Sequence, residues 1–150
     1  MPLEAYLCSR RQPKENNELI VNTPQQTFRA ALGQFFVKET STENLAAARS
    51  LIERSETAGA DLLVLPECII ARKLGMPEWG QKQAEPLDGP FVSGLREATR
   101  GRRVTVVCTV QAKIANESRY ANDLLVIQNG ELRLTYQKIH LYDAFRGKES

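Results

Sequence analysis

The apolar positions in the first half of the chain predict a strand, a helix and a second strand. Residues 28–37 form a short apolar and aromatic run that is typical of a β-strand. Ser41 or Thr42 can then cap a helix, which Gly59 can end in the left-handed conformation. Residues 61–66 are apolar without alternation, which predicts a parallel strand buried on both faces. The helix is expected to bury Leu45, Ala48, Leu51 and Ile52.

These three segments together predict a βαβ unit with a right-handed crossover. Residues 68–89 are rich in glycine and proline, and we expect a long loop there that contains a short helix. Pro90 suits the first turn of the next helix, and Gly101 suits its end. The run 103–110 then predicts a third strand.

The clearest local signal is a β-hairpin near the end of the chain. Asn129-Gly130 separates two apolar runs, 124–127 and 132–136. Asparagine and glycine tolerate the positive φ angles of a type I′ turn, so the two runs should pair. The predicted fold class is therefore α/β with a mixed β-sheet.

Residues 1–27 differ from the rest of the chain. They are polar, contain three prolines, and have only Leu19–Val21 as an apolar patch. Such a composition buries little apolar surface, which predicts a flexible N-terminal arm ahead of a domain that spans 28–150.

Composition narrows the classes of protein that the chain can represent. Its 150 residues suit one domain, and 20 Lys and Arg against 18 Asp and Glu give a net charge of only +2. This charge argues against a nucleic-acid partner, and no apolar run is long enough to cross a membrane. The N-terminus has no signal-peptide core, and three scattered cysteines with one histidine form neither a disulfide framework nor a zinc site. We therefore expect a cytoplasmic protein.

One local feature favours nucleic-acid binding, the cluster Arg100, Arg102 and Arg103. The cluster follows the second predicted helix, so we interpret it as a complement to the partial negative charge of the helix C-terminus.

Three polar residues after predicted strands are candidates for chemistry. Glu67 follows the strand 61–66, at the sheet edge where α/β proteins bind ligands, and burial there would raise its pKa and suit a general base. Lys138 follows the hairpin and can stabilise an oxyanion. A solvated loop glutamate and an exposed lysine are the more common situations for such residues. The single histidine, His140, is interpreted as a structural hydrogen-bonding group.

Taken together, three segments resemble the nitrilase, or carbon–nitrogen hydrolase, superfamily. They are Ala30–Gln34 in the first strand, Leu63–Glu67 after the helix, and Tyr136–Asp143 after the hairpin. The last two residues, Glu149-Ser150, are similar to the Glu-Ser of bacterial members related to deaminated-glutathione amidase.

The resemblance implies a fold, a reaction and a set of residue roles. The fold would be the N-terminal part of an αββα sandwich, a mixed β-sheet with helices on one face. Glu67 would be the general base, Lys138 the oxyanion-stabilising cation, and Glu149 the carboxylate that orients the lysine. The substrate would be a small-molecule amide, with a small ω-amide as the first choice. The resemblance implies no metal or organic cofactor, and a homo-oligomer would be consistent with it.

The chain departs from the family in one respect, the nucleophilic cysteine, which lies beyond the Glu-Ser segment in the family. Cys8 lies in the arm, Cys68 is interpreted as a pocket or core residue, and Cys108 as a small hydrophobic residue within a strand. We therefore expect the chain to be an N-terminal fragment of a hydrolase, either a natural fragment or the product of a split gene. Such a fragment would be inactive alone. The alternative is a non-catalytic module that docks a partner through an exposed sheet face.

Overall fold

The computed structural model describes residues 5–8, 27–76, 78–117 and 119–140, of which 5–8 are described by their backbone alone. No helix among these residues is long and apolar enough to span a bilayer. The strands are β1 (Ala5–Cys8), β2 (Ala30–Gly33), β3 (Leu62–Val64), β4 (Thr105–Lys113), β5 (Tyr120–Gln128) and β6 (Glu131–Gln137). The helices are α1 (Ser41–Thr57), α2 (Trp79–Gln83) and α3 (Pro90–Thr99).

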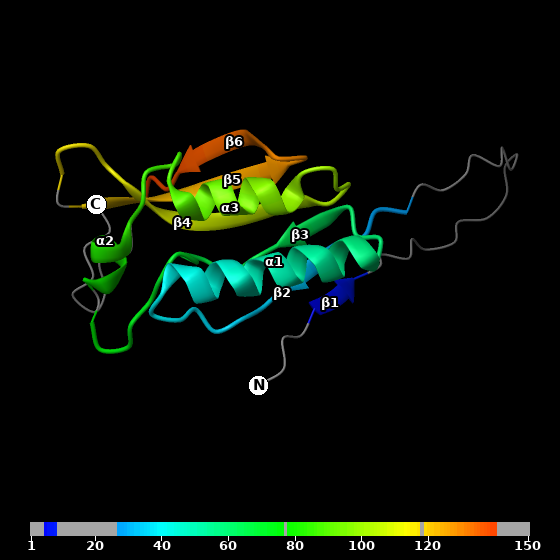
Figure 1. Ribbon diagram of the computed structural model, residues 1–150, viewed down its shortest axis with the longest axis horizontal. Coiled ribbons are helices and arrows are strands. Elements are labelled where there is room, and N and C mark those ends of the chain that lie inside the picture. The colour runs from blue at the N-terminus through cyan, green and yellow to red at the C-terminus, as the bar shows by residue number, and fades with distance from the viewer. Residues whose placement is uncertain (1–4, 9–26, 77, 118, 141–150) are drawn as a thin grey trace, which may run out of the picture.

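All the strands belong to one sheet, ordered β1-β2-β3-β4-β5-β6 (Figure 1). β2, β3 and β4 run parallel, whereas β1 and β5 are antiparallel to their neighbours. The mixed sheet and the predicted βαβ unit are thereby confirmed. Because β5 is antiparallel to both β4 and β6, the strands β3, β4 and β6 end at the same edge of the sheet.

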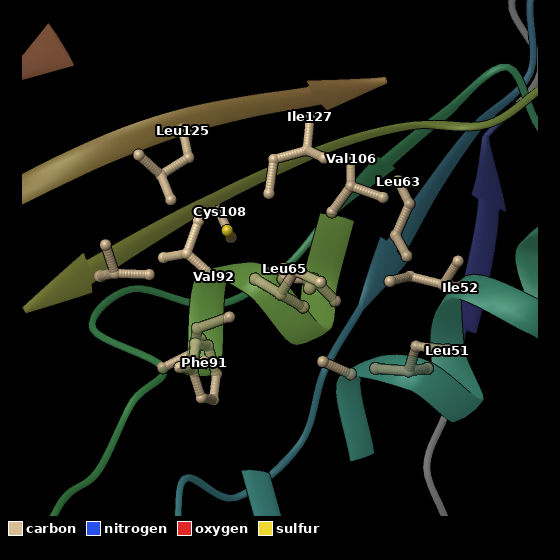
Figure 2. Packing of buried hydrophobic residues seen from close by; sticks show 14 of the residues in the cluster. Leu51, Ile52, Leu63, Leu65, Phe91, Val92, Val106, Cys108, Leu125 and Ile127 are labelled. Atoms are coloured by element: carbon tan, nitrogen blue, oxygen red, sulfur yellow. The ribbon is translucent and has the colours of Figure 1, made fainter. Parts of the chain in front are cut away.

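One face of the sheet is covered by helices. The register aligns Ala31, Leu63, Val106 and Ile127 across neighbouring strands, and all four are buried. α1 and α3 lie over this face in Figure 1, and their apolar side chains meet the sheet side chains in the core of Figure 2. The predicted arrangement, with helices on one face of the sheet, is thereby confirmed.

The other face carries a second apolar row. Leu32, Val64, Val107, Val126 and Leu134 are aligned by the register across β2 to β6, and we call this row the open face. Leu32 is 47% exposed and Leu134 is 52% exposed. The prediction that the strand 61–66 is buried on both faces is therefore wrong, because α1 and α3 cover only the face of the sheet that carries Leu63.

The ends of α1 follow local rules, with one correction to the predicted cap. Thr40, rather than Ser41 or Thr42, caps the helix: its Oγ1 accepts a hydrogen bond from the Glu43 N–H at 3.4 Å and donates to Glu43 Oε2 at 2.6 Å. The reason is that Glu43 stands three residues after Thr40, as in a capping box. Gly59 follows the helix with φ at +68°, as predicted.

The predicted hairpin is confirmed by its turn. Asn129 and Gly130 have φ angles of 48° and 78°, as a type I′ turn requires. The turn also docks on the end of α3, because Asn129 Oδ1 accepts a hydrogen bond from the Gly101 N–H at 2.7 Å and the Gly130 N–H donates to Thr99 Oγ1 at 3.0 Å.

The arginine cluster is occupied by contacts within the domain. Arg102 Nε donates to the Ala98 carbonyl at the end of α3, at 2.9 Å, as the sequence predicts. Arg103 forms an ion pair with Asp61 at 2.7 Å.

Four residues of the predicted N-terminal arm belong to the sheet. Ala5–Cys8 forms β1 at the edge of the sheet, paired antiparallel with β2. A four-residue strand is too short for its periodicity to stand out in the sequence. Most of the remaining arm lies outside the described residues, so its flexibility and the domain boundary at residue 28 stay predictions.

Candidate active site

The chain bulges out of the sheet directly after β3. The Leu65 N–H donates to the Val107 carbonyl at 2.9 Å, and the Ile69 N–H donates to the Thr109 carbonyl at 3.0 Å. The chain thus advances four residues while its partner β4 advances two. The surplus forms a bulge, Pro66–Cys68, with Glu67 at its centre.

Two side chains of β4 support this bulge. Thr109 Oγ1 accepts a hydrogen bond from the Cys68 N–H at 2.8 Å, where the backbone has a positive φ of 55°. The buried Gln111 amide accepts from the Ile70 N–H at 3.1 Å and donates to the carbonyls of Cys68 and Ala71 at 3.1 and 2.9 Å. One side chain therefore supplies hydrogen-bond partners to three backbone groups where the ladder of the sheet is interrupted.

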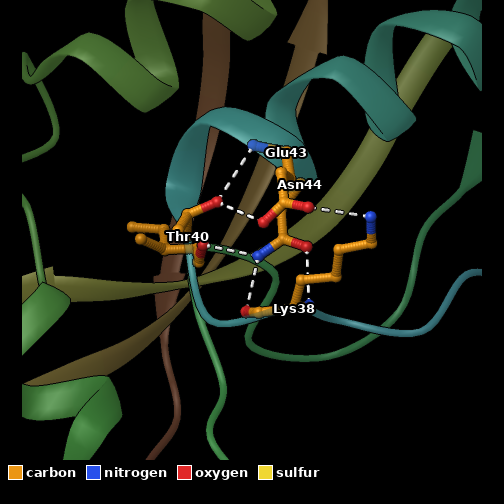
Figure 3. A network of polar contacts seen from close by, with 5 residues as sticks. Lys38, Thr40, Glu43 and Asn44 are labelled. Carbon is orange, nitrogen blue, oxygen red and sulfur yellow. Dashed lines mark hydrogen bonds and ion pairs between the residues drawn. The ribbon is translucent and has the colours of Figure 1, made fainter.

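A buried asparagine of α1 holds the same segment from the other side. Asn44 Nδ2 donates to the Ile70 carbonyl and to the Lys38 carbonyl, both at 2.9 Å. Its Oδ1 accepts a hydrogen bond from the Lys38 N–H at 2.7 Å, and Figure 3 shows this network at the start of α1. The position of Ile70 is therefore fixed by both the sheet and the helix.

The bulge brings Glu67 to Lys138. β3 and β6 are separated by two strands, roughly 14 Å at the usual strand spacing. Lys138 Nζ nevertheless lies 3.1 Å from Glu67 Oε1, and Asn122 Nδ2 of β5 donates to the same oxygen at 2.8 Å. Two candidate residues that are 71 positions apart in the sequence are thereby brought into contact.

The electrostatics of Glu67 differ from the expectation. Partial burial acts to raise the pKa of Glu67, but hydrogen bonds from Lys138 and Asn122 and the charge of Lys138 outweigh it and lower the pKa. The predicted raised pKa is wrong because the sequence did not place these two donors beside the carboxylate. Glu67 is therefore ionised at neutral pH.

The other candidate residues differ in their exposure to solvent, or lie outside the described part of the chain. His140 is exposed. Cys108 is buried as predicted, and burial raises the pKa of its thiol to about 12. Cys68 is half-buried at the end of the bulge. Glu149 and the side chain of Cys8 lie outside the described residues.

A neighbour of Asn122, Asp123, points to the opposite side of the sheet. Burial raises the pKa of Asp123, whose Oδ1 has no hydrogen-bond partner in the part of the chain that the structure describes. The register pairs it with Val110 of the helix-covered face. Asp123 is therefore not part of the Glu67 cluster.

A surface depression of about 430 Å³ lies beside the start of α1. Its lining includes Phe36, Arg72 and Leu74 but neither Glu67 nor Lys138. The described residues contain no group of three or more His, Cys, Asp or Glu side chains arranged to hold a metal ion.

Asn122 and Gln111 were not identified from the sequence. Gln111 lies just beyond the predicted strand 103–110, and Asn122 just before the predicted strand 124–127, so both fell outside the expected sheet. The usable signal was two polar residues that flank apolar strand segments, but only the register shows that they face each other.

Comparison with known proteins identifies the family. Residues 29–150 match the carbon–nitrogen hydrolase family. The chain belongs to this family. It is 32% identical over 120 residues to the deaminated glutathione amidase of Escherichia coli O157:H7 and 28% identical over 116 residues to the omega-amidase NIT2 of Danio rerio.

The carbon–nitrogen hydrolase chain spans less than half the length of these relatives. The first alignment covers 80% of this chain and 45% of the relative, and the second covers 77% and 41%. A crystal structure of an amidase from Nesterenkonia has the same fold over 77% of this chain and 45% of its own, with a TM-score of 0.63 and 24% sequence identity. The N-terminal portion of the nitrilase-type fold is thus present.

The bulge depends on Gln111, and Gln111→Leu tests this. The substitution removes the partners of three backbone groups, so we expect a loss of about 3 kcal/mol in the free energy of unfolding. Urea denaturation measures it. Gln128→Leu is the control, because Gln128 is exposed at the end of β5. Equal losses in the two variants would contradict the role of Gln111.

The exposed Glu67–Lys138 ion pair should affect the pKa of Glu67 more than it affects the free energy of unfolding. Lys138→Met should raise the pKa of Glu67, measured by carboxyl ¹³C NMR, because the ionised carboxylate loses its cation. Because the folded-state pKa is lowered, the contribution of Glu67 to stability is present above its unfolded pKa and is lost as the pH falls through the folded value.

The change in unfolding free energy at neutral pH should stay below about 1 kcal/mol, since Glu67 is 61% exposed. Lys138→Arg keeps the positive charge and is the control. A lower pKa of Glu67 in Lys138→Met would be inconsistent with the ion pair.

Proposed function

We propose that this chain contributes the base and the oxyanion-binding cation of an amidase that acts on small ω-amides. The observation that carries the proposal is the Glu67–Lys138 contact of 3.1 Å at the edge of the sheet where three strands end. The amidase names of the E. coli and Danio rerio relatives support the substrate class.

Glu67 and Lys138 have complementary roles in the proposed reaction. Glu67, ionised at neutral pH, accepts the proton of a cysteine thiol, and the resulting thiolate attacks the amide carbon. Lys138 stabilises the negative charge that develops on the amide oxygen. The carbon–nitrogen bond then breaks, and ammonia leaves with the proton that Glu67 took. Water hydrolyses the acyl-thioester to the carboxylic acid and restores the thiol.

The family resemblance adds two further elements to the proposal. Glu149 orients Lys138, and the nucleophilic cysteine comes from a polypeptide segment outside these 150 residues. Cys68 does not take the place of that cysteine in the proposal; it is half-buried at the end of the bulge, where its backbone is bonded to Thr109 and Gln111. The 150-residue chain by itself is therefore inactive, and the proposal includes neither a metal nor an organic cofactor.

A chimaera tests the two roles. The chain is extended with the C-terminal part of the E. coli amidase, and ammonia release from small ω-amides, including deaminated glutathione, is measured. We expect activity in the chimaera, no activity in the unextended chain, and a loss of at least about 100-fold in kcat for Glu67→Gln or Lys138→Met.

Glu53→Gln, an exposed substitution on α1, is the matched control and should keep full activity. An active Glu67→Gln chimaera would refute the proposed base. Ammonia release by the unextended chain that Cys68→Ala abolishes would instead identify Cys68 as the nucleophile.

The second candidate function is a non-catalytic module that docks another polypeptide through the open face. It is favoured by the apolar row itself, whose end residues Leu32 and Leu134 are half exposed. An apolar surface of this kind is typical of protein contacts.

A charged substitution on the open face tests this second function. Leu134→Asp should prevent association of the chain with a separately expressed C-terminal part of the E. coli amidase, because the contact would bury an unpaired carboxylate. Arg133→Asp, whose side chain is exposed on the same strand, is the control. Analytical ultracentrifugation measures the complex, and association that survives Leu134→Asp would exclude the open face.

A further inference from the structure

Asn122 touches both members of the Glu67–Lys138 pair. Its side-chain Nδ2 donates to Glu67 Oε1 at 2.8 Å, and its backbone carbonyl accepts a hydrogen bond from the Lys138 N–H at 2.9 Å. Asn122 is only 1% exposed and lies in β5, between the strands that lead to the other two residues. Of the two described side chains that donate hydrogen bonds to Glu67, Asn122 is the buried one.

Both hydrogen bonds to the Glu67 carboxylate end on the same atom, Oε1. Among the hydrogen bonds of the described residues, none reaches Oε2. The carboxylate therefore has one oxygen bound to the protein and one oxygen available to accept a proton.

Lys138 alone is poorly suited to hold this arrangement. A lysine has a long, flexible side chain, and that of Lys138 is 32% exposed. The asparagine side chain has two rotatable bonds and is enclosed in the sheet, so its ordering costs less conformational entropy.

The orientation of the Asn122 amide also follows from Glu67. An ionised carboxylate only accepts hydrogen bonds, so the amide must present its NH₂ group to Oε1. Its Oδ1 is then buried with no hydrogen-bond partner among the described residues, which costs stability. Local rules of this kind are broken mainly at functional sites.

We propose that Asn122 is a positioning residue: it fixes the Glu67 carboxylate through Oε1 and leaves Oε2 as the oxygen that accepts the proton. This role rests on the proposed function of Glu67 as the base. The hydrogen bond also favours the ionised form of Glu67, in agreement with its lowered pKa.

The test measures the pKa of the Glu67 carboxyl by ¹³C NMR titration of the 150-residue chain. The Glu67→Gln variant assigns the resonance. Asn122→Leu and Asn122→Ala should both raise the pKa of Glu67, because each removes the donor to its ionised form. Asn122→Leu keeps the branching of the asparagine side chain at Cγ, leaves no cavity and removes the unpaired Oδ1, so it should fold even if Asn122→Ala does not.

Thr99→Val is the matched control. Thr99 is also fully buried and hydrogen-bonded, to Arg96 and Gly130 at the turn end of the hairpin, and forms no hydrogen bond to Glu67. It should lower stability and leave the pKa of Glu67 unchanged. An unchanged pKa in Asn122→Leu, or an equal rise in Thr99→Val, would overturn the positioning role.

The two proposals fail separately. If Asn122→Leu raises the pKa of Glu67 while the Glu67→Gln chimaera stays active, Asn122 holds the Glu67 carboxylate as inferred, but Glu67 is not the base and the proposed function is wrong. If Glu67→Gln is inactive and Asn122→Leu leaves the pKa of Glu67 unchanged, the base is correct and the positioning role is wrong.

Discussion

The three hydrogen bonds of the Gln111 amide are the contacts on which the site depends. They allow the chain to leave the sheet at Pro66 and rejoin it at Ile69 without leaving buried backbone groups unpaired. Without this bulge, Glu67 would continue the line of β3 and stay about two strand spacings from the residues of β5 that it contacts. The Glu67–Lys138 contact at the sheet edge is thus supported by an uncharged side chain that is not part of it.

The unequal faces of the sheet explain how one domain can both fold and present a site. The helix-covered row supplies the buried core, in which residues such as Leu63 and Val106 are completely enclosed. The open face is apolar but half exposed, so it adds less to stability and leaves room for another polypeptide. Glu67, Lys138 and Asn122 meet where three parallel-running strands end, at the edge shared by both faces.

The site combines an exposed ion pair with a buried neutral donor. An exposed ion pair contributes little to stability. The buried donor Asn122 gives the carboxylate a fixed orientation, and together the two donors keep Glu67 ionised. The lowered pKa thus results from specific partners, against the opposing effect of burial.

The sequence by itself determined the local elements and the family, and it singled out Glu67 and Lys138, which the structure brings into contact. Periodicity and turn chemistry act over a few residues, so α1, α3 and the Asn129-Gly130 turn could be predicted. Only the tertiary structure decided which face stays open, that Ala5–Cys8 joins the sheet, and that the pKa of Glu67 is lowered. Each of these depends on residues far apart in sequence: 55 residues separate Glu67 from Asn122. The register between strands that no tight turn connects depends on the whole sheet, so local patterns along the chain do not show which distant residues it brings together.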